Sequence, residues 1–384
     1  MENENKDTIN KPNNINGENT AGVHTHTHRH IYQSFGRLIK CIIFFIIGLF
    51  IFETLTHIFV PKWVFPTDPA TPRIKGFYSE KSNTIDVLVI GASDVGRGYS
   101  PVTVWNKYGI TSYNLGTSNQ TMSLAYYLLK ESLNYQNPNV VVLDMDALFV
   151  DYDAPEGEYR KLFDNMKLGK VKLEAINDKN VRISDKDKLS YIFPLLRFHD
   201  KWDKLGKIDF KKSIKEESKA ISYKGMAMSC DIKPYIDNNK YMSEKGEIAT
   251  ITEENLYYVD KIVKLCEENS IKMLWTEIPS TTSWSLARNK TTQELANKYN
   301  IEFIDYNLES IRNELKFDWT KHTADQGNHL NVNGAEKISK HIGKVLSEKY
   351  NCKSHKKDKK ISKNWNKEAK RYKENKKKLE NTKK

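Results

Sequence analysis

The apolar segment from Ile85 to Ile90, which ends at Gly91, constrains the fold of this sequence most strongly. Five of its six residues are apolar and several are β-branched, which is typical of a strand buried on both faces of a parallel sheet. Small and polar residues follow, with Ser93 two positions after Gly91. Because ligands of open parallel sheets bind beyond the carboxyl ends of the strands, a hydroxyl at Ser93 is placed to meet a substrate. The alternative is that Ser93 only caps the next helix.

Further apolar segments alternate with helical patterns along the chain. Strands are predicted at 110–116, 140–146, 272–279 and 301–306, and helices at 101–108, 121–134, 253–269, 284–299 and 334–350. This alternation predicts βαβ units with right-handed crossovers, and therefore an α/β fold with helices on both faces of a parallel sheet. Residues 151–250 interrupt the alternation and are predicted to be a mostly helical insertion, which forms either a wall of the substrate site or a packing subdomain.

The N-terminal part of the chain lies outside this pattern. Residues 1–35 are polar and lack an apolar repeat, so they are predicted to be a disordered tail. Residues 36–60 are predicted to be a transmembrane helix: from Leu38 to Val60 the chain is mostly apolar, and as a helix this segment would be about 34 Å long, enough to span a membrane. A buried core helix and a cleaved signal peptide are the alternatives. The flanking charges do not decide the orientation.

The basic character of the chain is concentrated in its last segment. Residues 351–384 contain 15 Lys or Arg and 4 Asp or Glu residues, so they carry +11 of the formal net charge of +12. We predict a proline-rich linker at 61–80, the folded domain at 81–350, and a Lys-rich disordered tail at 351–384. If this tail lies outside the cell, anionic wall polymers or lipid headgroups are its expected partners; the alternative is a solubilising extension without a partner. The nearly neutral remainder gives no sign of specific nucleic-acid binding.

Polar motifs stand at the ends of several predicted strands and before the last helix. The second strand is followed by GTSNQ, the third ends in LDMD, and DQGNHLN precedes the last helix. A serine nucleophile needs a neighbouring base, and an imidazole base needs an orienting carboxylate. We therefore expect Ser93 and His329 to meet at one edge of the sheet. Backbone N–H groups near Gly116, or the side-chain amides of Asn119 or Gln120, are the candidate oxyanion donors.

The order of these motifs resembles the SGNH/GDSL hydrolase superfamily: G-x-S after the first strand, an isolated glycine after the second, and D-x-x-x-H-L-N-x-x-G-A before the last helix. More closely, residues 80–350 are similar to membrane-anchored bacterial SGNH-like proteins of cell-surface polysaccharide acylation. The resemblance implies a three-layer, flavodoxin-like parallel sheet. It also implies that Ser93 is the nucleophile, His329 the base and Gly116 an oxyanion donor.

The chain departs from the superfamily pattern at the oxyanion site. The usual G-D-S is Gly91-Ala92-Ser93, so the acid before the serine is absent. The asparagine of the third block has no counterpart in VVVLDMDAL. The resemblance therefore leaves one oxyanion contact to Asn119 or Gln120.

The supporting acid is also displaced. In the superfamily it usually lies three residues before the histidine, but Gln326 occupies that place and Asp325 lies four residues before His329. Asp325 is the expected orienting group, and Asp318 is the alternative. His322 is the alternative base.

The resemblance implies O-acyl transfer, most simply of acetyl groups, or ester hydrolysis on cell-envelope polysaccharide, through an acyl-enzyme on Ser93. It also implies a single-pass membrane protein with an extracellular catalytic domain, and a membrane-bound O-acyltransferase that supplies the acyl group. No cofactor is expected, and the four cysteines show no metal-ligand spacing. The alternatives are a non-catalytic envelope scaffold or binding protein, and a soluble esterase. The acyl group and its acceptor are not predicted.

Overall fold

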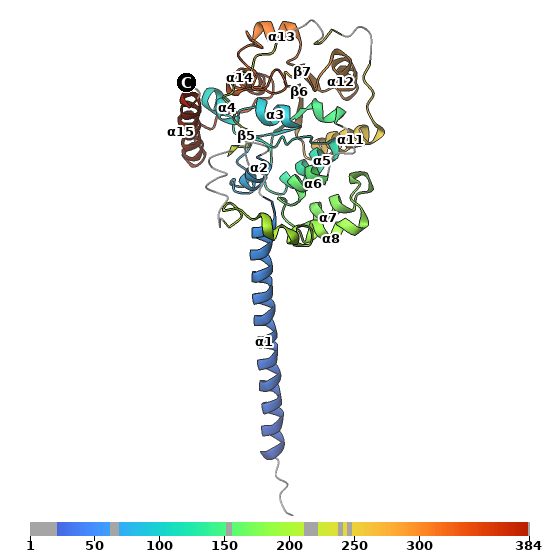
Figure 1. The fold of residues 1–384 in the computed structure, drawn as a ribbon, viewed down its shortest axis with the longest axis vertical. Coiled ribbons are helices and arrows are strands. Elements are labelled where there is room, and N and C mark those ends of the chain that lie inside the picture. Colours follow the sequence, from blue (N-terminus) through green and yellow to red (C-terminus); the bar gives the residue numbers. More distant parts are fainter. Residues whose placement is uncertain are drawn as a thin grey trace, which may run out of the picture. The chain divides into compact units, whose positions relative to one another are not determined.

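The computed structural model describes residues 21–61, 69–150, 156–210, 222–236, 241–243 and 248–382 (Figure 1). The chain divides into two compact units, residues 1–57 and 58–384. The first unit holds most of helix α1 (Ala21–Phe59), and the second holds the sheet and all other described elements. Each unit is therefore described by itself.

Helix α1 contains one apolar stretch, Phe35–Phe59, of 25 residues that is long enough to cross a membrane. A signal sequence near the N-terminus has the same general properties. This stretch agrees with the predicted anchor at 36–60 to within one residue at each end. The predicted disorder of the preceding segment is wrong from Ala21 onward, because the helix already begins there. Once the apolar stretch is helical, each further residue extends an existing hydrogen-bond ladder, which costs far less than starting a helix. The rest of the predicted N-terminal tail, residues 1–20, lies outside the described residues.

The second unit is built on a five-stranded parallel sheet, which confirms the predicted α/β class. Its strands lie in the order β2-β1-β3-β6-β7. This is a doubly wound order: from β1 the chain first adds β2 on one side, and then adds β3, β6 and β7 on the other. Val89 of β1 pairs with Asn114 of β2 on one side and with Val142 of β3 on the other. The strands are β1 (Val87–Ile90), β2 (Ser112–Asn114), β3 (Val140–Asp144), β6 (Lys272–Glu277) and β7 (Glu302–Asp305).

Helices cover both faces of this sheet because neighbouring residues of each strand point to opposite sides. Leu88 and Val141 belong to one apolar core, and Val87 and Val140 belong to the other. The first core is covered by α5 (Met122–Ser132), α11 (Glu253–Glu268) and α12 (Leu286–Tyr299). The second is covered by α4 (Pro101–Tyr108) and α14 (Val332–Glu348). The short helices α3 (Ser93–Gly98) and α13 (Glu309–Glu314) complete the alternating part.

Most of the described elements of residues 151–250 are helices, and most of these helices join the main core. Tyr159 and Phe163 are buried with the side chains of α5, so these residues do not form a separate core. The segment contains α6 (Glu156–Phe163), α7 (Lys170–Asn177), α8 (Asp185–Ile192) and α9 (Leu195–Phe198), followed by the hairpin of β4 (Ser222–Tyr223) and β5 (Met226–Ala227). Short 3-10 turns lie at Met145–Phe149, Lys179–Val181 and His199–Lys204.

Part of the predicted linker belongs to the folded domain. Helix α2 (Ala70–Phe77) lies within residues 61–80, and its Ile74 and Phe77 are buried in the main core. Pro72 falls in the first turn, where the missing N–H removes no helical hydrogen bond. The predicted linker at 61–80 is therefore wrong for Ala70–Phe77, where the prolines are compatible with the start of a helix.

The predicted disorder of residues 351–384 is likewise wrong. Residues Lys359–Asn381 form helix α15, which lies beside α4 (Figure 1). Trp365 is 2% exposed and stacks on Trp105 of α4, with ring centroids 5.3 Å apart. Tyr372 is also buried, two turns further along the same face. Burial of two large aromatic side chains outweighs the repulsion among the lysines of this segment.

Candidate active site

Ser93 lies directly beyond the carboxyl end of β1, at the first residue of α3. Gly91 makes the turn possible: its φ is +153°, and a Cβ there would lie 2.5 Å from Cβ of Asp144 on the neighbouring strand. The N-cap of α3 is Ala92. Ser93 is therefore not the capping residue that the alternative interpretation required.

The Ser93 hydroxyl instead contacts His329. The distance from His329 Nε2 to Ser93 Oγ is 2.9 Å, and that from His329 Nδ1 to Asp325 Oδ2 is 2.6 Å. The other Asp325 carboxylate oxygen accepts the backbone N–H of His329. These three side chains form one continuous hydrogen-bonded chain.

The conformation of the loop before α14 explains why Asp325, four residues before His329, can reach its imidazole. Gln326 and Gly327 both have positive φ, so the chain turns tightly between Asp325 and His329. Thr323 and Leu330 bridge the base of this loop, and the Asn331 side chain caps α14 directly after it. The loop is thereby anchored at both ends, which holds the imidazole over the end of β1.

The electrostatics of Asp325 suit an orienting carboxylate. Burial alone would raise its pKa, but the hydrogen bonds from the side chain and backbone of His329 outweigh burial and hold the pKa below its ordinary value. Arg97 Nη1 lies 3.7 Å from the same carboxylate and acts in the same direction. Asp325 is therefore ionised at neutral pH and favours the His329 tautomer that carries its proton on Nδ1.

The predicted oxyanion donors do not all reach the site. Gln120 is fully buried, and its side-chain amide bonds Gly91 N–H, the Leu115 carbonyl and the Thr117 hydroxyl. Its bonds hold the loop after β2 against the loop after β1, so it serves as a structural tie. The sequence did not distinguish these roles, because an amide beside a strand end suits both.

Gly116 and Asn119 line the same cavity as Ser93 and His329. A Cβ at Gly116 would lie 2.8 Å from the backbone nitrogen of Gly96, so only glycine fits between these loops. The Gly116 N–H donates to the Asn114 side chain at 3.0 Å. The backbone N–H of Ser93 belongs to the first turn of α3, where N–H groups have no acceptor within the helix.

The alternative base does not meet Ser93. His322 Nδ1 accepts the backbone N–H of Asp318 at 2.8 Å, and its ring packs against Phe317. Asp318 pairs with Lys321. His322 and Asp318 thus stabilise the segment before α14.

The cavity has a volume of about 470 Å³, and most of the residues that line it have polar side chains. Two arginines that the sequence analysis did not single out, Arg73 and Arg97, contribute to its lining, as does Ala227 from the β4–β5 hairpin. Arg73 is almost fully buried, and its Nε donates to the Gly225 carbonyl at 2.7 Å. No local sequence signal identifies Arg73, because its position depends on the docking of α2.

Asp94 is a further side chain that the sequence analysis missed. It is 2% exposed, accepts the Ser283 hydroxyl, and has Oδ1 3.9 Å from His329 Nε2. Burial and the neighbouring carboxylates of Asp146 and Asp325 raise its pKa well above the ordinary value. Its place directly after the serine was the available signal.

Asp94 belongs to a group of buried carboxyls, of which Asp94 and Asp146 line the cavity. Burial is the main reason that Asp144 and Glu277 have pKa values well above the ordinary range, and it raises the pKa of Asp146 to about 6. Arg288 lies 3.7 Å from Asp146 and partly offsets this effect. Within the described ranges, no group of three or more His, Cys, Asp or Glu residues has a metal-site arrangement.

Comparisons with known proteins add little to this picture. No protein-family model matches the chain, and no curated protein matches it. Among solved structures, it is similar to a putative acylhydrolase from Bacteroides fragilis, with 12% sequence identity and a TM-score of 0.33, over 72% of this chain and 95% of that chain. A likeness of this size assigns the chain neither a family nor an activity.

Proposed function

We propose that this chain is an SGNH/GDSL-type serine esterase or O-acyltransferase that acts on acyl esters, most simply acetyl esters, of cell-envelope polysaccharide. The observation that carries the proposal is the hydrogen-bonded chain Ser93–His329–Asp325 at the carboxyl end of β1. Nucleophile, base and orienting acid are the three parts that serine-mediated acyl transfer requires.

The first half-reaction transfers the acyl group to the enzyme. His329 Nε2 takes the proton of Ser93 Oγ while that oxygen attacks the ester carbonyl. The tetrahedral intermediate then collapses, the alcohol oxygen leaves, and it takes the proton from Nε2. Asp325 holds the proton on Nδ1 throughout and stabilises the imidazolium that forms.

The second half-reaction regenerates the serine. An acceptor hydroxyl, from a glycan or from water, gives its proton to His329 Nε2 and attacks the acyl-enzyme. Ser93 Oγ then leaves and recovers the proton. A glycan acceptor makes the protein a transferase, and a water acceptor makes it a hydrolase.

The oxyanion in both steps needs hydrogen-bond donors. The candidates are the backbone N–H groups of Ser93 and Gly116, with the Asn119 amide beside them. Gly116 N–H would exchange the Asn114 side chain for the oxyanion. Asp94, whose pKa burial raises well above its ordinary value, also lies close to Nε2.

In this proposal α1 is a single membrane anchor, and the catalytic domain lies outside the cell. A membrane-bound O-acyltransferase would then deliver the acyl group across the bilayer to Ser93. The apolar stretch Phe35–Phe59 supports the anchor, and the outward orientation follows only from the resemblance to envelope proteins.

A fluorophosphonate probe tests the proposal, because it reacts with activated serines. We expect stoichiometric labelling of the wild type at Ser93, identified by peptide mass, and none in Ser93→Ala. Ser118→Ala is the matched control: Ser118 lines the same cavity but bonds Glu158 and Lys161, so labelling should persist. An unlabelled wild type would contradict the proposal and favour a non-catalytic scaffold or binding protein.

Turnover of a small acetyl ester provides the second measurement. Ser93→Ala and His329→Ala should each reduce kcat by about 10³-fold or more, and the double variant should be little worse, since the two residues act as a unit. Asp325→Asn should cost less, because Asp325 takes no part in bond changes. His322→Ala is the control and should retain activity; loss of activity there, with His329→Ala active, would overturn the assignment of the base.

A further inference from the structure

Helix α15 has two faces with different environments. One face packs on the domain through Ser362, Trp365 and Tyr372. Trp365 stacks on Trp105, whose indole N–H also donates to Asn366 at 3.1 Å. The Tyr372 hydroxyl donates to Glu336 of α14 at 3.0 Å. These contacts, about two turns apart along the helix, fix its rotation about its axis.

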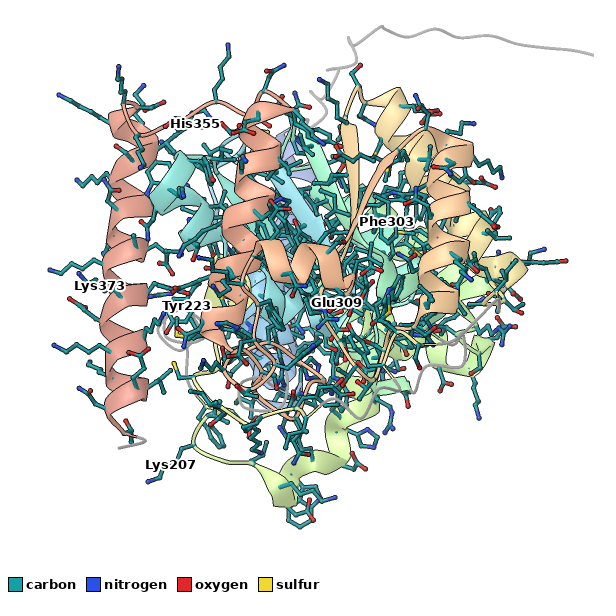
Figure 2. All side chains as sticks on the ribbon, turned by 90° about the horizontal axis from the view of Figure 1, so that it is seen from above. Lys207, Tyr223, Phe303, Glu309, His355 and Lys373 are labelled. Atoms are coloured by element: carbon teal, nitrogen blue, oxygen red, sulfur yellow. The ribbon has the colours of Figure 1, made fainter. Side chains whose placement is uncertain are left out.

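The opposite face, here called the lysine face, is exposed and strongly basic. Figure 2 shows Lys373 pointing away from the body of the domain. The exposed lysines of this helix are Lys359, Lys360, Lys363, Lys367, Lys370, Lys373, Lys377 and Lys378. Glu374 and Glu380 are its only exposed acidic residues, and Glu374 lies 4.0 Å from Lys370. The lysine face therefore carries a large positive excess along about 34 Å of helix.

This arrangement is unfavourable for the protein alone. Lys359 and Lys363, and Lys373 and Lys377, are separated by four residues, a spacing at which like charges on a helix repel each other. The docked aromatic side chains hold the segment in the helical conformation, so these like charges stay close together. A ligand with regularly spaced negative charges would relieve the repulsion along the whole face.

The lysine face is part of the same unit as the cavity. Tyr372 packs with Met226 and Val332 in one apolar cluster. Ala227, next to Met226, lines the cavity, and Val332 follows His329 by three residues. A polymer bound along α15 is thus held by the body that carries Ser93.

We propose that the lysine face binds the acidic groups of a linear anionic polysaccharide, whose ester groups react in the cavity. This inference rests on the proposed function for the identity of the polymer. Lysine ammonium groups are compact point charges that do not demand a fixed geometry, which suits spaced phosphates or carboxylates on a flexible chain.

Other polyanions fit this face less well. Insertion into a lipid surface needs exposed apolar side chains, and Leu379, 37% exposed at one end of the helix, is its only exposed large apolar residue. Single-stranded nucleic acids stack their bases on exposed aromatic rings, whereas Trp365 and Tyr372 are buried. A nucleic acid also carries no acyl ester, the group on which the proposed chemistry acts.

Binding of fluorescent polygalacturonate, a linear anionic glycan, tests the inference. The variant Lys363→Gln, Lys370→Gln, Lys373→Gln, Lys377→Gln removes four charges from the lysine face. The control Lys170→Gln, Lys186→Gln, Lys264→Gln, Lys298→Gln removes four exposed charges from α7, α8, α11 and α12. At low salt we expect about tenfold or more weaker binding for the first variant and less than about twofold for the control.

Equal weakening in both variants would overturn the inference, because net charge alone would then explain binding. Failure of the wild type to bind polygalacturonate would also overturn it, as would tighter lysine-face-dependent binding of duplex DNA or phosphatidylglycerol vesicles. Neutral dextran is the baseline.

The same variants separate this inference from the proposed function. Fluorophosphonate labelling of Ser93 and turnover of a small acetyl ester should be unchanged in both, while KM for acetylated polygalacturonate should rise only in the lysine-face variant. Binding is also measured in Ser93→Ala. Polymer binding without labelling of Ser93 would contradict the proposed activity and support polysaccharide binding by the lysine face. Labelling of Ser93 without polymer binding would contradict the lysine-face inference alone.

Discussion

At the residue scale, the site depends on which polar side chains already form hydrogen bonds that hold the loops together. Ser93 and His329 are free to bond each other because α3 is capped by Ala92 and α14 by Asn331. Gln120 is held by three backbone and side-chain partners and cannot serve as a donor without breaking them. Polar residues at strand ends thus divide into those that build the loops and those that face the cavity.

Glu277, the last residue of β6, provides a pH-dependent test of the buried carboxyls. It is fully buried, and among the described residues neither carboxyl oxygen has a hydrogen-bond partner. Burial, followed by Asp144, Asp146, Asp94 and Asp305, raises its pKa well above the ordinary value of 4.5. The folded state therefore holds a proton that the unfolded state releases, so stability falls as pH rises above about 4.5.

We expect Glu277→Gln to be more stable than the wild type at neutral pH, because the amide has no proton to lose. The difference in Tm should grow as the pH rises above about 4.5, by up to about 2 °C per pH unit, until the pH passes the raised pKa of Glu277 in the folded state. Differential scanning calorimetry across this range checks it. Glu309→Gln, at an exposed position, is the control and should show a constant difference; a Glu277→Gln curve parallel to the wild type would contradict the assignment.

At the scale of elements, helix α2 precedes the alternating strands and helices in the sequence, helix α15 follows them, and both pack on the domain. Arg73 and Ile74 of α2 are buried although the segment is rich in proline, and α15 docks although it is rich in lysine. In both helices a few buried side chains at helical spacing decide the structure, and the composition of the exposed face has little influence.

Trp365→Ala tests the docking of α15. Removing a buried tryptophan should lower the free energy of unfolding by about 3–5 kcal/mol and Tm by at least about 6 °C. Thermal unfolding followed by circular dichroism measures this, with the exposed substitution Lys367→Ala as control, expected within about 0.5 kcal/mol of the wild type. An unchanged Tm in Trp365→Ala would mean that the helix does not pack on the domain.

At the scale of the whole molecule, the chain combines a long helix that contains an apolar stretch with an α/β domain. Twelve consecutive residues, Cys41 to Phe52, carry no charge, and large apolar side chains such as Phe44 and Phe50 are exposed within α1. Exposed apolar surface of this extent requires a lipid environment or removal of the segment.

Carbonate extraction of membranes distinguishes these outcomes. We expect the full chain to remain in the membrane pellet, because an apolar helix of this length inserts stably. The matched control Ile43→Asp, Ile46→Asp, Leu49→Asp keeps the length but places three charges in the apolar stretch, and it should be released, since each charge costs about 2.5–3.5 kcal/mol there. Release of the wild type, or an N-terminus beyond Phe59 in the mature protein, would contradict the anchor.

The sequence by itself determined the parallel α/β sheet of five strands and the apolar N-terminal helix. Both depend on local patterns: runs of apolar residues such as Val87 to Ile90 form buried strands wherever they occur, and alternation with helices requires parallel connections. The ends of parallel strands meet at one edge, which is why Ser93 and His329 could be paired although 236 positions separate them.

Only the tertiary structure decided which residues support that pair. Gln120 is a structural tie, Asp94 lies beside His329, Arg73 reaches the cavity from α2, and Trp365 docks a lysine-rich helix. Each of these roles depends on partners distant in sequence, because the energy of a buried polar or aromatic group is set by what surrounds it and not by its neighbours along the chain.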